Sequence, residues 1–389
     1  MTTGETAALV RRQDGSTRAT LLELLFDVVF VAALAMVSRL VAEHDGWPGI
    51  ASVLLMLTAI WWTWSVTTTT TEFYDPQQGP IQAILMVAMV GSVGMAAALP
   101  NRYGLIFALA YVTTHVVRGI ILITTLSRTR HRTATARATR FLFWFLVSGV
   151  FWIAGGISST AKWQLWAVAM AIDLTAAALR YPTPRLGRVP LWQYKGTTEH
   201  LGERYQQFVI LALGDIILMP VLRVGQRGFD HLPAVALLCA FVTMLLLWHV
   251  YVFRAGQLLE AGITGRRAAR IAPYTHLVML VGVVVTASAF HLVVEQPSGT
   301  TPVRLLILII GGPMLFVVGR ALFALVVAGH VPWWRAGWQL LPLLALPWAG
   351  GWPPLLVSVV VAITLAAHVM IPPEQRDTRP GAVARGTGT

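Results

Sequence analysis

The chain has 389 residues and a formal net charge of +12, with 56% hydrophobic and only 12% charged residues. A soluble domain carries about 25% charged residues, so this composition excludes a fold whose whole surface faces water. The single cysteine, Cys239, excludes an intrachain disulfide and a cysteine-based metal cluster. We therefore expect an all-α, polytopic bundle of helices surrounded by lipid.

Apolar stretches of bilayer-spanning length, roughly 20 residues, recur almost from end to end. Twelve spans are predicted, at residues 21–42, 50–68, 81–99, 104–126, 141–158, 163–180, 206–222, 232–253, 272–293, 302–328, 336–350 and 352–371. The last two are separated only by the Gly-Gly-Trp-Pro-Pro run at 350–354. The predicted organisation is a tail at 1–20, a transmembrane domain at 21–371 and a tail at 372–389. The first span is expected to act as the insertion signal, because residues 1–20 are polar and no cleavage site follows it.

Basic residues indicate the orientation of the chain. They concentrate in both tails and in the segments after the fourth, sixth and eighth predicted spans. Cytoplasmic loops carry the excess of Lys and Arg, so both termini are predicted to be cytoplasmic and the number of spans even. The segment 69–80, cytoplasmic in this scheme, carries Glu72 and Asp75 but no basic residue. The positive charge is interpreted as a topology signal, and no nucleic-acid partner is expected, because the basic loops lack interleaved aromatic residues.

This orientation predicts the behaviour of reporter fusions. A reporter placed after residue 135 or after residue 375 should report a cytoplasmic position, and one placed after residue 160 should report the outside. Paired alkaline phosphatase and fluorescent-protein fusions measure this directly. An exported reporter after residue 375 would contradict the predicted orientation.

Two acidic residues lie in the first predicted span, where a charge at the helix centre costs about 2.5–3.5 kcal/mol. Glu23 and Asp27 are four residues apart and therefore share one helical face. Two carboxylates placed so close repel each other unless a basic group lies opposite or one of them is protonated.

The entry to the seventh predicted span, residues 199–205, offers that basic group. His200 and Arg204 share a face, and Asp215 follows Arg204 by three turns, about 16 Å along the axis. The first and seventh spans should run in the same direction, which places Arg204 at the depth of Glu23 and Asp27. Arg204 is therefore the predicted partner of one of these carboxylates.

Other polar and aromatic residues fall within the predicted spans, and the simplest interpretation is one polar cluster open to the cytoplasm. The candidate pathway residues are Glu23, Asp27, His115, Arg118, Asp173, His200, Glu203, Arg204, Asp215 and His276, with Trp61, Trp62 and Trp64 as a possible aromatic lining. Structural alternatives exist for each: an interfacial Glu23, an ion pair that only fixes helix order, histidines satisfied in the core, and tryptophans that anchor the membrane interface. No catalytic motif, metal motif or cofactor site is predicted.

The same residues resemble the bacterial low temperature requirement A (LtrA) family. Residues 22–31 read LELLFDVVFV, similar to the family's LELFFDLVFV, and residues 200–205 (HLGERY) and 208–215 (FVILALGD) are similar to its HLxER and FVIxxLGES. WWTW at 61–64, FYDP at 73–76, HL at 276–277 and GGP at 311–313 follow in the family's order, so the resemblance covers about 17–370. Asp215 stands where the family has glutamate, and Phe253 where it has aspartate. The resemblance implies a bacterial inner-membrane protein linked to growth in the cold, without a defined substrate.

Three functions are consistent with these sequence features. Intramembrane carboxylates with a nearby arginine and histidines are typical of a transporter or channel coupled to protons or cations. An accessory protein that supports the membrane in the cold is the first alternative. A membrane-embedded lipid-modifying enzyme is the second, although no nucleophile and base have the required spacing. The predicted partners are the lipid bilayer and a small solute or ion, and the oligomeric state is left open.

Overall fold

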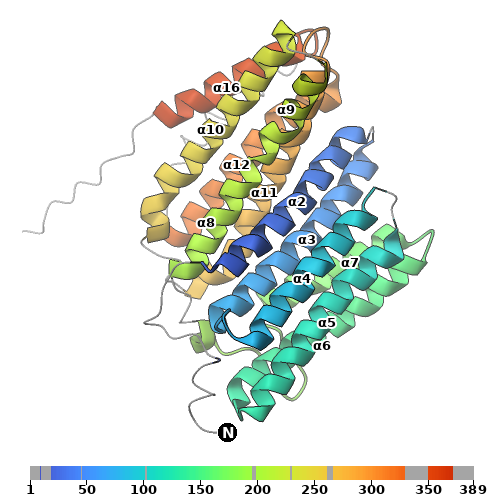
Figure 1. Cartoon of the computed structure of the whole chain (residues 1–389), viewed down its shortest axis with the longest axis vertical. Coiled ribbons are helices and arrows are strands. Elements are labelled where there is room, and N and C mark those ends of the chain that lie inside the picture. Colours follow the sequence, from blue (N-terminus) through green and yellow to red (C-terminus); the bar gives the residue numbers. More distant parts are fainter. Residues whose placement is uncertain are drawn as a thin grey trace, which may run out of the picture.

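The computed structural model describes residue 9 and residues 19–44, 46–100, 103–194, 199–227, 230–260, 266–328 and 349–370. Helices dominate these ranges and no strand occurs within them (Figure 1). The helices are α2 (Leu21–Glu43), α3 (Trp47–Phe73), α4 (Gly79–Ala98), α5 (Gly104–Arg128), α6 (Arg132–Ile157), α7 (Lys162–Ala178), η1 (Leu191–Tyr194), α8 (Glu199–Leu213), α9 (Asp215–Arg227), α10 (His231–Glu260), α11 (Arg266–Glu295), α12 (Val303–Ala328) and α16 (Pro354–Met370).

Nine segments in the described ranges are long and apolar enough to cross a membrane, and together α8 and α9 make one of them. The predicted spans at 163–180 and 352–371 correspond to α7 and α16, which have 17 residues each. The predicted span at 336–350 lies almost wholly outside the described residues. The all-α, multi-span architecture is thus confirmed for the described part of the chain.

Two helices extend past the predicted spans, and the extension of α3 affects the site. Helix α3 continues to Phe73 instead of ending at 68, so Glu72 lies in a helix and not in a loop. The threonines at its end bond back into the helix: the Thr67 hydroxyl donates to the Thr63 carbonyl at 2.7 Å, and the Thr70 hydroxyl to the Val66 carbonyl at 2.9 Å. These bonds satisfy the hydroxyls within the helix, which lets a polar threonine run continue it. Helix α6 likewise begins at Arg132, ahead of the predicted 141.

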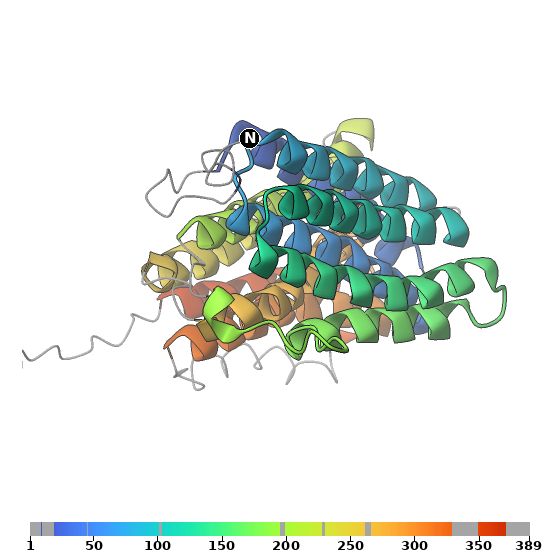
Figure 2. The same ribbon diagram turned by 90° about the horizontal axis from the view of Figure 1, so that it is seen from below.

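Helices α2 and α3 form the centre of the bundle. Helix α2 packs against α3, α4, α8, α9 and α11, and α3 packs against α4, α5, α7, α8 and α11. Figures 1 and 2 show α4–α7 on one side of this pair and α8–α16 on the other. The start of α2, the end of α3 and the start of α8 meet at the same end of the bundle (Figure 1). Polar residues near these three helix ends are therefore brought together.

Helices α11 and α12 approach each other closely through glycines. A Cβ on Gly282 would lie 2.5 Å from the backbone nitrogen of Phe316, and one on Gly312 would lie 2.6 Å from that of Thr286. Only residues without a side chain allow two backbones so near, as is common between helices in membranes. Helix α11, held closely to α12 in this way, packs against α2 and α3.

The segment from Tyr181 to Tyr194 crosses the end of the α4–α7 group, and arginines hold it. Arg140, on α6, donates to the carbonyls of Gly187 at 3.1 Å and Leu186 at 2.5 Å. Arg137, also on α6, donates from Nη1 to Gln193 Oε1 at 3.4 Å and from Nη2 to the Tyr74 hydroxyl at 2.9 Å. These two arginines, interpreted from the sequence as topology signals, also fix the covering segment in place.

Candidate functional site

The site begins in the first turn of α2. Thr20 caps the helix, and the Glu23 carboxylate folds back so that its Oε2 accepts hydrogen bonds from the Thr20 backbone nitrogen at 2.9 Å and hydroxyl at 3.0 Å. This capping box satisfies helix-terminal donors and fixes the Glu23 side chain. Glu23 is 0% exposed, which excludes the alternative of a carboxylate that reaches the lipid headgroups.

Asp27, one turn further along α2, contacts two helices at once. Its Oδ1 accepts a hydrogen bond from Arg204 Nη2 at 2.7 Å and another from the Trp64 indole nitrogen at 2.8 Å. Asp27 and Arg204 are both 0% exposed. The predicted pairing of Arg204 with a carboxylate of the first span is confirmed, and Asp27 is the direct partner.

His200 joins two carboxylates. Its Nε2 lies 3.4 Å from Glu23 Oε1, and its Nδ1 lies 3.0 Å from Glu72 Oε2. Sequence reasoning missed Glu72 because the threonine run was interpreted as the end of the span. Its spacing could have revealed it, since Glu72 follows Trp61 by 11 residues, or three helical turns, and so lies on the same face.

These five residues, Glu23, Asp27, Glu72, His200 and Arg204, form what we call the carboxylate cluster. Three carboxylates face one guanidinium and one imidazole, so negative charge is in excess when His200 is neutral. Several of its buried atoms make no hydrogen bond within the described residues: Glu23 Oε1, Asp27 Oδ2, Arg204 Nε and Arg204 Nη1. A buried group with excess negative charge and spare hydrogen-bonding capacity can take up a proton or a cation.

Aromatic rings enclose the cluster on the side away from Glu23. Trp61 and Trp64 stack with ring centres 4.8 Å apart, and Trp64 meets Tyr205 edge-on at 5.2 Å. The Trp61 indole donates to the carbonyl of Pro273, at 2.8 Å. Trp61, Trp62 and Trp64 are at most 3% exposed, so they lie inside the protein and are not lipid-facing anchors.

A second polar group lies on the other side of α3. The Tyr111 hydroxyl donates to Asp173 Oδ2 at 2.7 Å, and Arg118 Nη2 lies 2.7 Å from His115 Nδ1. His115 Nε2 lies 3.3 Å from the Thr63 hydroxyl on α3. The sequence-predicted polar residues thus fall into two groups separated by α3, where a single cluster was expected.

Asp215 lies deeper in the bundle, at a break between α8 and α9. Gly214 forms a turn there, its nitrogen donating to the Leu211 carbonyl at 3.1 Å. Asp215 is 3% exposed, and neither of its carboxylate oxygens makes a hydrogen bond within the described part of the chain. Asp215 lies beside Ser38 on α2. The Ser38 hydroxyl donates its hydrogen bond to the Ala35 carbonyl of its own helix. The same 11-residue step separates Asp27 from Ser38 and Arg204 from Asp215, so α2 and α8–α9 run parallel, as predicted.

Two further predicted residues have other roles. Glu203 is half-buried, and its carboxylate accepts a hydrogen bond from Gln207 at 3.0 Å, so it lies outside the carboxylate cluster. The helical turn explains this, because Glu203 points about 100° away from Arg204. His276 is fully buried between the Ala272 carbonyl at 2.9 Å and the Tyr251 hydroxyl at 3.2 Å. These contacts account for both of its ring nitrogens.

Within the described ranges, no group of three or more His, Cys, Asp or Glu side chains is arranged to hold a metal ion. The carboxylate cluster spreads its acids around a guanidinium and an imidazole. Its arrangement is suited to proton exchange between neighbouring groups and to charge pairing.

Comparison with known proteins identifies the family of the chain. The family described as bacterial low temperature requirement A protein (LtrA) matches residues 18–370, which include every residue of the carboxylate cluster. The uncharacterized protein RA0937 of Rhizobium meliloti (strain 1021) is 31% identical over 333 residues, covering 82% of this chain and 80% of that protein. No solved structure matches the chain. With its spanning helices, the chain is a multi-pass membrane protein that belongs to the bacterial low temperature requirement A family.

Proposed function

We propose that this protein is a proton-coupled secondary transporter of the bacterial inner membrane, with the carboxylate cluster as its coupling site. The observation that carries the proposal is the position of His200 between Glu23 and Glu72. A neutral imidazole donates from one nitrogen only, so it can donate a hydrogen bond to one of these two carboxylates at a time. Hydrogen bonds between His200 and both carboxylates require one more proton, on the imidazole or on a carboxyl group. The cluster therefore has two states that differ by one proton.

The location of the cluster supports access from one side of the membrane. It lies where α2 and α8 begin and α3 ends, within about two turns of each of these helix ends. With both termini in the cytoplasm, as the basic residues indicate, this end of the bundle faces the cytoplasm. The proposed site thus exchanges protons with the cytoplasmic side.

Asp215 supplies a second acidic position about 16 Å further along the same helix line. It follows the break at Gly214, and broken helices with buried acids are a recurring feature of ion sites in secondary transporters. Its carboxylate oxygens make no hydrogen bond within the described residues, which leaves both of them available to take up a proton. We infer that Asp215 receives the proton on its way across the membrane.

The experiment that tests this function measures proton movement in reconstituted vesicles. Vesicles loaded with a pH-sensitive dye are given a panel of solutes, with and without a pH gradient. We expect one solute class to drive proton uptake with the wild-type protein, and Asp215→Asn to abolish that uptake while the protein stays folded. Asp230→Asn, at an exposed position before α10, is the matched control and should transport normally. Equal proton uptake by Asp215→Asn and wild type would exclude Asp215 from the pathway.

An accessory role in the cold is the second candidate, and one observation favours it. The Arg204–Asp27 pair is wholly buried and joins α2 to α8, which a purely structural ion pair would also do. Such a protein would hold its helices together without moving a solute. The double-mutant cycle described in the Discussion separates the two roles.

A further inference from the structure

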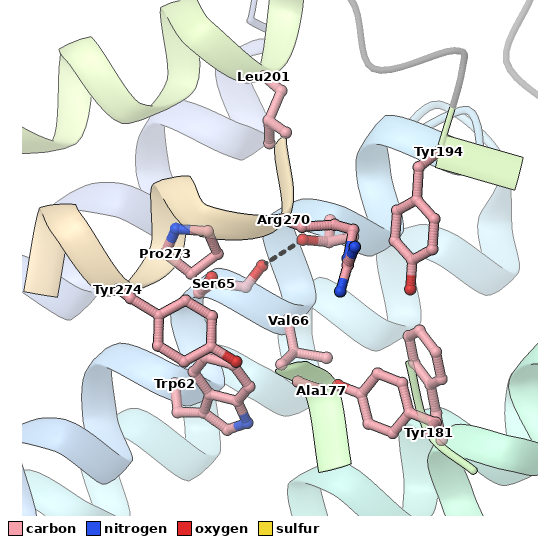
Figure 3. A pocket seen from close by; sticks show the side chains of 12 residues that line it. Trp62, Ser65, Val66, Ala177, Tyr181, Tyr194, Leu201, Arg270, Pro273 and Tyr274 are labelled. Atoms are coloured by element: carbon pink, nitrogen blue, oxygen red, sulfur yellow. Dashed lines mark hydrogen bonds between the residues drawn. The ribbon is translucent and has the colours of Figure 1, made fainter. Parts of the chain in front are cut away.

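A cavity of about 60 Å³ lies beside the carboxylate cluster, on an adjoining face of α3 (Figure 3). Helices α3, α6, α7, α8 and α11 and the 181–194 segment contribute to its wall. Most of the wall is aromatic or aliphatic, and the twelve lining residues are Trp62, Ser65, Val66, Thr69, Phe141, Ala177, Tyr181, Tyr194, Leu201, Arg270, Pro273 and Tyr274. No function described so far uses this cavity.

The twelve lining residues give the cavity wall positive charge only. Arg270 is the only ionic side chain among the twelve, and no acidic residue lines the cavity. Arg270 Nη2 donates to the Ala178 carbonyl at 2.7 Å, while its Nε makes no hydrogen bond within the described residues. Arg137 and Arg180 also lie near Tyr194 and add positive potential at this end. A cationic ligand would be repelled here, although aromatic walls alone would suit one.

The uncharged polar groups of the wall add hydrogen-bond donors. The Trp62 indole nitrogen is buried and makes no hydrogen bond within the described ranges. Figure 3 shows the Arg270 guanidinium and the side chains of Trp62 and Tyr181 around the same space. Burial raises the pKa of Tyr181, which lies outside the spanning helices, well above its usual value, so its hydroxyl keeps its proton. Donors together with one positive charge select an anionic or hydrogen-bond-accepting ligand.

Helix α3 carries two adjoining stripes that link the cavity to the cluster. Trp62, Ser65 and Thr69 line the cavity, whereas Trp64 and Glu72 bond within the cluster. The Ser65 hydroxyl lies 3.0 Å from the hydroxyl of Tyr205, the residue next to Arg204. On α8, Leu201 lines the cavity beside His200 of the cluster. A ligand in the cavity would therefore contact α3 and α8, two of the helices that carry the carboxylate cluster.

We propose that this cavity binds a small organic carboxylate, whose oxygens accept hydrogen bonds from Arg270, the Trp62 indole and the Tyr181 hydroxyl, and whose short apolar chain lies against the aromatic and aliphatic wall. The cavity volume of about 60 Å³ is far below the about 300–1,000 Å³ of pockets for drug-sized ligands, so it restricts the ligand to a small molecule. This inference depends on the proposed function in one respect only: the anion bound in the cavity is taken to be the solute that the protein transports. A proton bound at the cluster would then offset the negative charge of the anion during transport.

The test is direct binding to the purified full-length protein in nanodiscs, with radiolabelled butyrate as the probe. Wild type should bind butyrate, and unlabelled butyramide, its uncharged isostere, should compete far less well. Arg270→Gln should weaken butyrate binding by about 10- to 100-fold, because a charge-assisted hydrogen bond is lost. Arg270→Lys should recover part of the affinity. Tyr181→Phe, which keeps the ring and removes one donor, should weaken binding by about fivefold.

Arg39→Gln is the matched control, since Arg39 forms an exposed pair with Glu43 at the far end of α2. It should bind butyrate like wild type. Thermal melting checks that Arg270→Gln is folded, and Tyr181→Phe provides the readout if it is not. Equal competition by butyramide, or affinity unchanged in Tyr181→Phe and Arg270→Lys, would overturn the proposal. So would loss of butyrate binding when phosphatidylglycerol replaces phosphatidylcholine in the nanodisc, because a lipid would then occupy the cavity.

Transport measurements separate this inference from the proposed function. Asp215→Asn should still bind butyrate but should lose its proton-driven accumulation in vesicles. If wild type binds butyrate but accumulates no solute in vesicles, the cavity is a carboxylate site and the transporter proposal is refuted. Proton-coupled accumulation of another solute, without butyrate binding, would refute the cavity assignment alone.

Discussion

Replacing Arg204 with glutamine is expected to destabilise the protein by about 3–5 kcal/mol, because it leaves Asp27 buried without its counter-ion. Asp27→Asn should cost a similar amount by stranding Arg204, while its amide oxygen can still accept the Trp64 hydrogen bond. The double variant should lose less than the sum of the two, since neither charge then lacks a partner. Thermal or denaturant unfolding in detergent, followed by tryptophan fluorescence, measures the cycle.

The exposed pair Arg39–Glu43 gives the matched control cycle. Its atoms are 2.6 Å apart, but the side chains are 51% and 45% exposed, so its coupling should be no more than about 1 kcal/mol. Strict additivity at Asp27 and Arg204 would show that the buried pair does not interact.

The same cycle distinguishes the two candidate functions when it is run beside a cold-growth complementation assay. A structural pair predicts that the double variant regains both stability and growth. A proton-carrying pair predicts that stability returns while growth stays lost, because no titrating carboxylate remains at position 27. Recovery of growth in the double variant would therefore favour the accessory role.

Replacing His200 with alanine should have the second large effect. Without the imidazole, Glu23 and Glu72 lose the group that lies 3.4 Å and 3.0 Å from their carboxylates, and two like charges then face each other in a buried site. We expect a loss of about 3–5 kcal/mol in stability, the usual cost of removing one member of a buried ionic contact. Proton-coupled transport should fall to the level of protein-free vesicles.

Adding Glu72→Gln to His200→Ala should restore part of the stability by removing one of the two charges, but it should not restore transport. His231→Ala, at an exposed position on α10, is the control and should match wild type in both assays. A His200→Ala protein that melts and transports like wild type would show that His200 neither holds these carboxylates nor moves a proton.

The sequence alone determined the class of protein and the central contact of the site. Composition and recurring apolar stretches indicated an all-α membrane bundle, because lipid leaves no other way to satisfy the backbone. Helical periodicity placed Glu23 with Asp27 and His200 with Arg204, and the parallel direction of two spans paired Arg204 with this acidic face. These inferences succeeded because they depend on spacing along single helices and on the order of the spans.

Tertiary structure decided what spacing could not. Glu72 joined the site because α3 continues through its threonines, whose hydroxyls bond to the helix's own carbonyls. Trp62 and Trp64 are two residues apart yet face different places, one the cavity and the other Asp27. Periodicity gives the faces of a helix, but which neighbour covers each face depends on packing among helices distant in sequence. The separation of His115, Arg118 and Asp173 from the cluster has the same cause, because α3 lies between the two groups.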